Sequence, residues 1–170
     1  MDFLELAKER YSCRKMNEKS VEKEKIEKIL QAGILAPTAT NAQPYKIWVV
    51  ESEDAKKRLA EANRYIFGAE IFFIVGAKKD AAWVRKFDNH NFAEIDASIV
   101  ATHMMLEITD LGLATTWVGH FDEPKLKEVM PELKDYELIA IFPVGYPAED
   151  ALPNERHNIR RSIEEAVDFV

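Results

Sequence analysis

The segment from about residue 92 to residue 111 constrains the fold more than any other part of the chain. Its apolar residues recur at helical spacing but cover more than one stripe of the helix surface: Ile95, Ala97, Ile99, Val100, Ala101, Met104, Met105, Ile108 and Leu111. A helix that is apolar on most of its circumference has to be covered on most sides. We therefore expect a long central helix, buried nearly all round, with the other elements packed around it.

Short apolar segments on either side of this helix predict the other elements. β-Branched and aromatic runs predict strands at residues 45–50, 70–77, 115–121 and 137–147. Helices are expected at residues 3–10, at residues 54–64, from residue 123, and between Ser20, the expected N-cap, and Pro37. This alternation excludes an all-helical or all-β fold, and the absence of a linker or repeat predicts one domain over residues 1–170. Residues 147–161 are polar and proline-bearing, which predicts an ordered arm or a loop.

The charge balance and the cysteine count exclude several classes of protein. A formal net charge of -7 opposes binding to nucleic acid, which depends on clustered positive charge. The single Cys13 excludes an internal disulfide and a redox-active cysteine pair, so any redox chemistry would come from a cofactor. The charged N-terminal segment and the lack of an apolar run of about 18 residues predict a cytoplasmic protein without a membrane span.

A basic strip, "RYSCR" at residues 10–14, follows the first expected helix. Arg10, Ser12 and Arg14 occupy every second position, and guanidinium groups with a hydroxyl are suited to a phosphate monoester. A second basic pair, Arg160 and Arg161, lies near the other end of the chain. Taken alone, both groups are more often solvated surface.

The stretch "APTATNAQPYKIWVV" at residues 36–50 leads from a helix into a strand. Its small, hydroxyl and amide side chains would allow a planar ligand to approach closely, but an ordinary turn uses the same residues. Metal and nucleophile patterns are incomplete. His90 with Glu94 has helical spacing but lacks a further ligand, and no GxSxG or Walker sequence is present. A hydrolase or nucleotidase is therefore disfavoured.

The order of short sequence blocks resembles the nitroreductase family of flavin mononucleotide (FMN) enzymes. The blocks are "RYSCR", "APTATNAQPY", "EAN", "DLGLATTWVGHFD", "PVGYP" and "IRRSIEEAV", and they span nearly the whole chain. The resemblance implies an α+β fold of three α/β/α layers with a mixed, mainly antiparallel central sheet. It also implies a homodimer that exchanges C-terminal arms (about 148–170), FMN at the dimer interface, and NAD(P)H as the electron donor.

The same resemblance implies roles for the residues of the basic strip. Arg10 and Ser12 match positions that meet the FMN phosphate, and Tyr11 belongs to the same cofactor-binding segment. Arg14 matches a basic residue that lies nearer the pyrimidine edge of the flavin. These four residues are the expected N-terminal part of the FMN site.

Residues near the end of the chain are expected to complete the site. Arg160 and Arg161 match a C-terminal basic pair on the phosphate, although a serine follows the pair where the family usually has proline. Trp117, Val118 and Gly119 match a "WIG" block that passes the flavin. The phosphate would thus be held from both ends of the chain.

A third group of residues is expected at the flavin ring. Pro37, Thr38, Ala39 and Asn41 match a "PSSxN" loop that reaches the flavin bound mainly by the other subunit, with Ala39 in place of the usual serine. Asn63 matches an asparagine that meets the pyrimidine edge of the ring. The resemblance therefore predicts a site built from two subunits.

The implied chemistry needs no side-chain acid or nucleophile. A reduced flavin carries negative charge, which a fixed arginine such as Arg14 would stabilise. The short connection at residues 78–92 leaves little material to cover the flavin, and Trp83 and Phe87 could flank a flat nitroaromatic or quinone acceptor. Two alternatives remain: a flavin-binding or storage module without turnover, and an oxygen-using flavin enzyme on the same fold.

Overall fold

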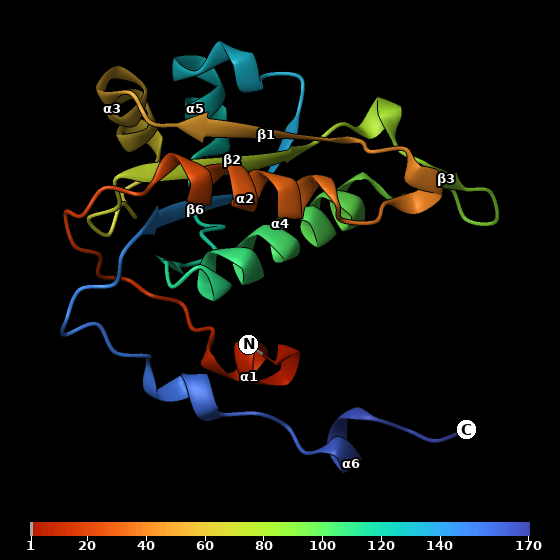
Figure 1. The fold of residues 1–170 in the computed structure, drawn as a ribbon. Helices are drawn as coiled ribbons and strands as arrows, with labels where there is room; N and C mark the ends of the chain where they lie inside the picture. Colours follow the sequence, from red (N-terminus) through yellow and green to blue (C-terminus); the bar gives the residue numbers. More distant parts are fainter. Residues whose placement is uncertain (1) are drawn as a thin grey trace.

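A four-stranded sheet forms the centre of the molecule (Figure 1), which is a computed structural model that describes residues 2–170. The strand order is β1 (Tyr45–Val50), β2 (Ile71–Ala77), β6 (Glu137–Gly145) and β5 (Ala114–Thr115). All three neighbouring pairs are antiparallel. A parallel contact, an isolated bridge between Ser12 and Thr115, joins the basic strip to the edge of the sheet.

Helices cover both faces of this sheet. Helices α2 (Lys23–Ile34) and α4 (Ala93–Asp110) pack on one face, and α3 (Glu53–Ala62) and α5 (Glu123–Val129) pack on the other (Figure 1). Successive side chains of a strand point to opposite faces, so Phe73 joins the α2/α4 core whereas Phe72 joins the α3/α5 core. The prediction of an α+β fold in three layers is confirmed.

Helix α4 is central, and most of its circumference is buried, as its composition predicts. Seven of its residues are buried, and the helix ends before Gly112, whose φ of 70° suits a glycine after a helix end. One stripe differs from the prediction, because no element within residues 2–170 lies over it. Ile95 is 40% exposed there, and Glu94, Thr102 and His103 lie beside it along a shallow groove.

The strand expected at residues 115–121 is much shorter, because Pro143 interrupts its ladder. Thr115 pairs with Val144, and Val118 pairs with Ile141. In this register residue 116 lies opposite Pro143, which has no N–H to donate to a backbone hydrogen bond. The Thr115 hydroxyl donates to the Pro143 carbonyl instead (2.8 Å). The segment leaves the sheet between the two pairs, and Trp117 packs edge-on against Phe142 there.

Two further details differ from the sequence prediction. Ser20 does not cap α2, because its hydroxyl donates to the Glu70 carboxylate (2.9 Å) and Glu22 occupies the N-cap position. His90 does not share a helix with Glu94, because it lies in a hairpin formed by β3 (Val84–Arg85) and β4 (His90–Asn91).

The N-terminal helix and the C-terminal arm both lie on the side of α4 away from the sheet (Figure 1). Helix α1 (Phe3–Glu9) begins at Asp2, whose carboxylate accepts the Leu4 N–H. The C-terminal arm, residues 148–170, runs past α1 and holds only the short helix α6 (Ile163–Ala166) and a turn of 3₁₀ helix at Glu155–Asn158. Within residues 2–170, no helix is long and apolar enough to cross a membrane.

Candidate functional site

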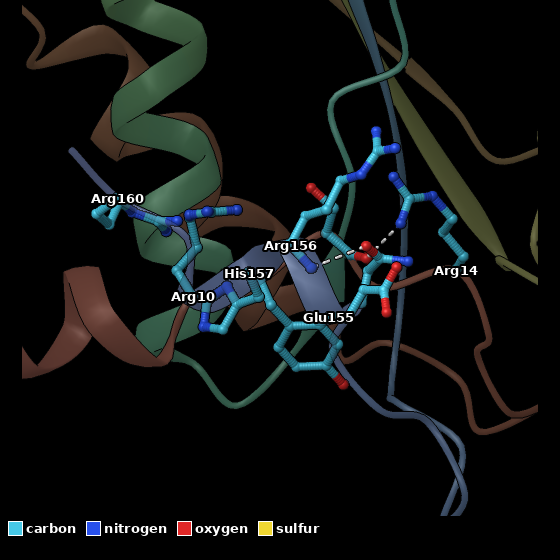
Figure 2. A pocket seen from close by; sticks show the side chains of 9 residues that line it. Arg10, Arg14, Glu155, Arg156, His157 and Arg160 are labelled. Atoms are coloured by element: carbon cyan, nitrogen blue, oxygen red, sulfur yellow. Dashed lines mark hydrogen bonds between the residues drawn. The ribbon is translucent and has the colours of Figure 1, made fainter.

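A basic cleft of about 580 Å³ lies between the basic strip and the C-terminal arm (Figure 2). Its lining residues are Arg10, Tyr11, Ser12, Arg14, Asn154, Glu155, Arg156, His157 and Arg160. Several contacts fix the arm against the residues on either side of the strip. The His157 ring bonds the Lys8 carbonyl (Nε2 to O, 3.0 Å), Ala148 donates its N–H to the Lys15 carbonyl, and Lys15 forms an ion pair with Asp150.

The extended backbone of the strip explains which side chains enter the cleft. The Cys13 N–H donates to the Thr115 carbonyl (2.9 Å), and the Cys13 side chain is buried against Met16 and Ala114. Because neighbouring side chains of an extended chain point to opposite sides, Ser12 and Arg14 face outward. The strip therefore has a buried side, which carries Cys13, and a polar side, which carries Ser12 and Arg14.

The cleft concentrates positive charge, because four arginines and one carboxylate, Glu155, line it. Burial, together with the nearby Arg160, lowers the pKa of Arg10, although a guanidinium group stays protonated at any ordinary pH. In the part of the chain that the structure describes, no ion pair joins Arg10, Arg14, Arg156 or Arg160 to a carboxylate. Figure 2 shows Arg10 and Arg160 at one side of the cleft and Arg14 at the other. Such an arrangement favours a bound anion.

Tyr11 adds a neutral polar group to this cleft. Burial is the main cause that raises its pKa to about 12, and the Cys13 thiol beside it contributes. The phenol is therefore uncharged at neutral pH, and it can donate a hydrogen bond without adding negative charge to the site.

A second hollow, the aromatic pocket, adjoins the basic cleft and shares Arg14 with it. Its volume is about 210 Å³, and it is lined by Arg14, Tyr65, Phe67, Thr116, Trp117, Val118, Gly119 and His120. The Tyr65 ring lies 5.8 Å from both the Phe67 ring and the His120 ring. A flat aromatic group with an anionic tail would match the two adjoining hollows in both shape and charge.

Asn63 lies beside these hollows, but its side chain is bonded locally. It is 1% exposed, and its Oδ1 accepts the Tyr65 N–H at 3.2 Å. It lines a third hollow of about 380 Å³ with Arg64, and that hollow shares His120 with the aromatic pocket. Its observed bonds shape the turn that carries Tyr65.

The structure does not bring all predicted residues together in one subunit. Arg10, Tyr11, Ser12, Arg14 and Arg160 share the basic cleft, and Trp117, Val118 and Gly119 line the aromatic pocket.

The other predicted residues lie outside both hollows. The loop that contains Pro37, Thr38, Ala39 and Asn41 lies near the start of α4, where the Ala39 N–H donates to Asp96. Arg161 does not line the cleft. Within one subunit these five residues contribute nothing to the two hollows.

Some lining residues were not predicted from the sequence. Arg156 and His157 enter the cleft from the arm, and Tyr65 and Phe67 form one wall of the aromatic pocket. The basic cluster "RHNIRR" at residues 156–161 could have indicated Arg156 and His157. No comparable signal marked Tyr65 and Phe67, because aromatic residues before a strand are usually core.

No metal site accompanies the two hollows: among residues 2–170, no group of three or more His, Cys, Asp or Glu side chains is arranged to hold a metal ion.

The sequence model of the Nitroreductase family matches residues 7–66 and 63–146, which include the basic strip, the aromatic pocket and the sheet. The chain belongs to the nitroreductase family.

Known members of the nitroreductase family resemble this chain over most of its length. A nitroreductase family protein of Clostridium difficile 630 has a crystal structure that is 39% identical, with a TM-score of 0.91 over 99% of this chain and 98% of that one. A protein of Archaeoglobus fulgidus, provisionally named an NADH dehydrogenase/NAD(P)H nitroreductase, is 30% identical over 88% of this chain and 87% of its own length.

A third relative was solved with a ligand. A provisionally named nitroreductase of Exiguobacterium sibiricum 255-15 was crystallised in complex with FMN, and it is 21% identical with a TM-score of 0.84 over 100% of this chain and 98% of that chain. At this identity the likeness concerns the fold.

Proposed function

We propose that this protein binds FMN and transfers electrons from NAD(P)H through it to a small organic acceptor. The observation that carries the proposal is a cleft that is lined by four arginines and that adjoins an aromatic pocket at Arg14. Family membership and a relative that binds FMN support the same cofactor.

The residues present fit FMN. The basic cleft offers several guanidinium groups and the Ser12 hydroxyl to a phosphate monoester, and the aromatic pocket offers flat, apolar walls to a ring. Arg14 lines both hollows, so a ligand that spans them would pass this residue. Riboflavin has no phosphate, so it would leave the basic cleft without an anion to bind.

Bound FMN supplies the chemistry of hydride acceptance and electron transfer. The chain's own residues bind and orient it. Arg10, Ser12 and Arg160 would hold the phosphate, and Arg14 would place a fixed positive charge beside the aromatic pocket, where it would favour negative charge on the ring. No side-chain acid or nucleophile takes part, because holding the donor and the acceptor in turn against the ring is sufficient.

A second copy of the chain completes the proposed site. The 37–43 loop carries the predicted Pro37, Thr38, Ala39 and Asn41 but lies outside both hollows of its own subunit. The exposed stripe of α4 around Ile95 and the C-terminal arm are surfaces that a partner would cover. We therefore propose a homodimer with exchanged arms, in which the loop of one subunit reaches the flavin of the other.

The proposed acceptors are flat aromatic compounds such as quinones and nitroaromatics. The segment between β2 and α4 is only a small hairpin with a short 3₁₀ turn before it, so little of this chain can roof the flavin. Trp83 packs edge-on against Phe92 at the base of that hairpin (centroids 4.9 Å apart), whereas Phe87 at its tip is 98% exposed. Phe87 is therefore the hairpin aromatic that is free to contact an acceptor.

Chromophore analysis tests the cofactor. The purified protein should be yellow, and denaturation should release FMN. Titration of the apoprotein should show tighter binding of FMN than of riboflavin or FAD. Release of FAD, or riboflavin affinity equal to that of FMN, would contradict the role given to the basic cleft.

Steady-state kinetics test the reaction. If one pocket receives NAD(P)H and then the acceptor, double-reciprocal plots with both substrates varied should give parallel lines. Intersecting lines would indicate a ternary complex and hence a second site. Flavin that NAD(P)H does not reduce under anaerobic conditions would instead favour a binding or storage module.

A further inference from the structure

A buried carboxylate holds the 37–43 loop in place. Asp96 lies in the first turns of α4 and is 1% exposed. Its Oδ1 accepts the Ala39 N–H at 2.9 Å, and this bond joins α4 directly to the loop. Its Oδ2 is also buried, and no hydrogen-bond donor reaches it within residues 2–170.

Stability alone does not account for a carboxylate at this position. A buried charge is unfavourable unless its polar atoms are paired, and here one of the two oxygens is not. The start of α4 and the Ala39 N–H supply partial positive charge, which explains how the group is tolerated. An apolar side chain would pack into the same core without this cost, so the carboxylate serves the loop that it contacts.

The loop has an unusual backbone. Thr40, Asn41 and Gln43 have φ values of 54°, 56° and 50°, a left-handed conformation that non-glycine residues rarely adopt and that is especially unfavourable for a β-branched threonine. Such strain persists only where surrounding contacts impose it, and it concentrates at functional sites.

Two side chains supply contacts of this kind. Asp96 binds the Ala39 N–H, and the Thr38 hydroxyl accepts the Gln43 N–H at 3.0 Å. Residues 40–43 are nevertheless exposed, so the strained shape presents polar groups to the outside rather than to this subunit's core.

We propose that Asp96 is a positioning residue of the flavin site: its Oδ1 fixes the 37–43 loop in the shape that contacts FMN bound by a second copy of the chain. This inference rests on the proposed function. It adds a residue that does not touch the cofactor but determines whether the loop can. The geometry of the carboxylate, rather than its charge, performs this role, because the Ala39 N–H is the group it binds.

Two substitutions separate geometry from charge. Asp96→Asn keeps an oxygen acceptor at the same distance and removes the charge, whereas Asp96→Glu keeps the charge and displaces it by one methylene. We expect Asp96→Asn to bind FMN within about threefold of the wild type, and Asp96→Glu and Asp96→Ala to bind it at least about tenfold more weakly, the factor expected when one hydrogen bond that positions the loop is lost.

Amide hydrogen exchange of the full-length protein provides a readout apart from activity. Without FMN, the Ala39 amide should exchange at least about tenfold faster in Asp96→Ala than in the wild type, because its acceptor is gone. The control is Val100→Ala, which removes buried volume one turn further along α4. It should lower thermal stability without accelerating exchange at Ala39.

Three outcomes would overturn the inference: unchanged Ala39 exchange in Asp96→Ala, equal FMN affinity of Asp96→Asn and Asp96→Glu, or an equal loss of affinity in Val100→Ala. If Asp96→Ala does not fold, the comparison of FMN affinity between Asp96→Asn and Asp96→Glu still tests the inference. Arg10→Ala separates this inference from the proposed function. If Arg10→Ala weakens FMN binding and the Asp96 variants do not, only the positioning role fails, whereas no effect of Arg10→Ala contradicts the FMN site itself.

Discussion

Arg10 and Arg160 come from opposite ends of the chain, yet their guanidinium groups are close enough to repel each other. Partial burial and that repulsion both lower the pKa of Arg10; an anion bound between the two groups would reduce the repulsion and offset the cost of burying the charge. The spacing of the basic strip is compatible with a phosphate site, but only the family resemblance singled it out from ordinary surface. Arg156 and His157 could not be assigned in the same way, because only the path of the arm brings them into the cleft.

Arg10→Ala should weaken FMN binding by about 1.5–3 kcal/mol, because it removes a hydrogen bond to a charged phosphate. The fold should be unaffected, since Arg10 lies at the end of the exposed helix α1. Fluorescence titration of the apoprotein measures the change. The control is Lys57→Ala, which removes an exposed cation on α3. Equal FMN affinities of the two variants would show that the strip is ordinary solvent-exposed surface.

At the scale of elements, apolar runs located β1, β2 and β6 to within a few residues, because a buried strand shows its composition directly. Local patterns failed where a distant residue decided the outcome. Pro143 on the neighbouring strand shortens β5, and Glu70 takes the hydroxyl of Ser20 away from α2. Neither effect can be seen in the segment that it changes.

The turn at Gly68 should tolerate no side chain. Gly68 has a φ of 76°, and an added Cβ would lie 3.0 Å from the Met16 carbonyl oxygen, so strain and a backbone contact add together. Gly68→Ala should lower the free energy of unfolding by about 1–3 kcal/mol. In Gly119→Ala the new methyl group would meet nothing within 4 Å, so the change should stay within about 0.5 kcal/mol. Urea denaturation compares the two, and similar losses would show that the turn is adaptable.

The tip of the hairpin should affect the acceptor and not the cofactor. If Phe87 contacts an aromatic acceptor, Phe87→Ala should raise KM for quinones by about two- to tenfold, in line with the strength of aromatic pairs, and leave FMN affinity unchanged. Lys86→Ala changes the neighbouring exposed residue and serves as the control. A rise in KM that is the same for both variants, or absent from both, would remove Phe87 from the site.

For the whole molecule, the apolar surface of a single subunit is the informative feature. Phe3 on α1, Ile95 on α4, and Ile163 and Phe169 on the C-terminal arm are all between 40% and 93% exposed. The sequence predicted that α4 needs cover on nearly every side, but a single chain cannot show what supplies the cover on the last side. We propose that a second copy of the chain supplies this cover.

Light scattering at micromolar concentration should therefore show a dimer of the flavin-loaded protein. Ile95→Arg places a charge in the stripe of α4 that the partner is proposed to cover, so it should favour monomers and reduce FMN affinity together. Glu128→Arg, on the exposed side of α5 in the opposite layer, should do neither. A flavin-loaded monomer in the wild type would exclude the proposed two-subunit site.

The position of the basic cleft also fixes when it can form during protein synthesis. One wall comes from residues near the start of the chain and the other from residues 154–160, so the sheet and its covering helices can be complete while the cleft still lacks half of its lining. A chain that has folded its core without residues 154–160 would therefore offer a phosphate only the basic strip. A shortened chain that lacks residues 154–160 should then fold its sheet and helices but retain little FMN, so it should be nearly colourless.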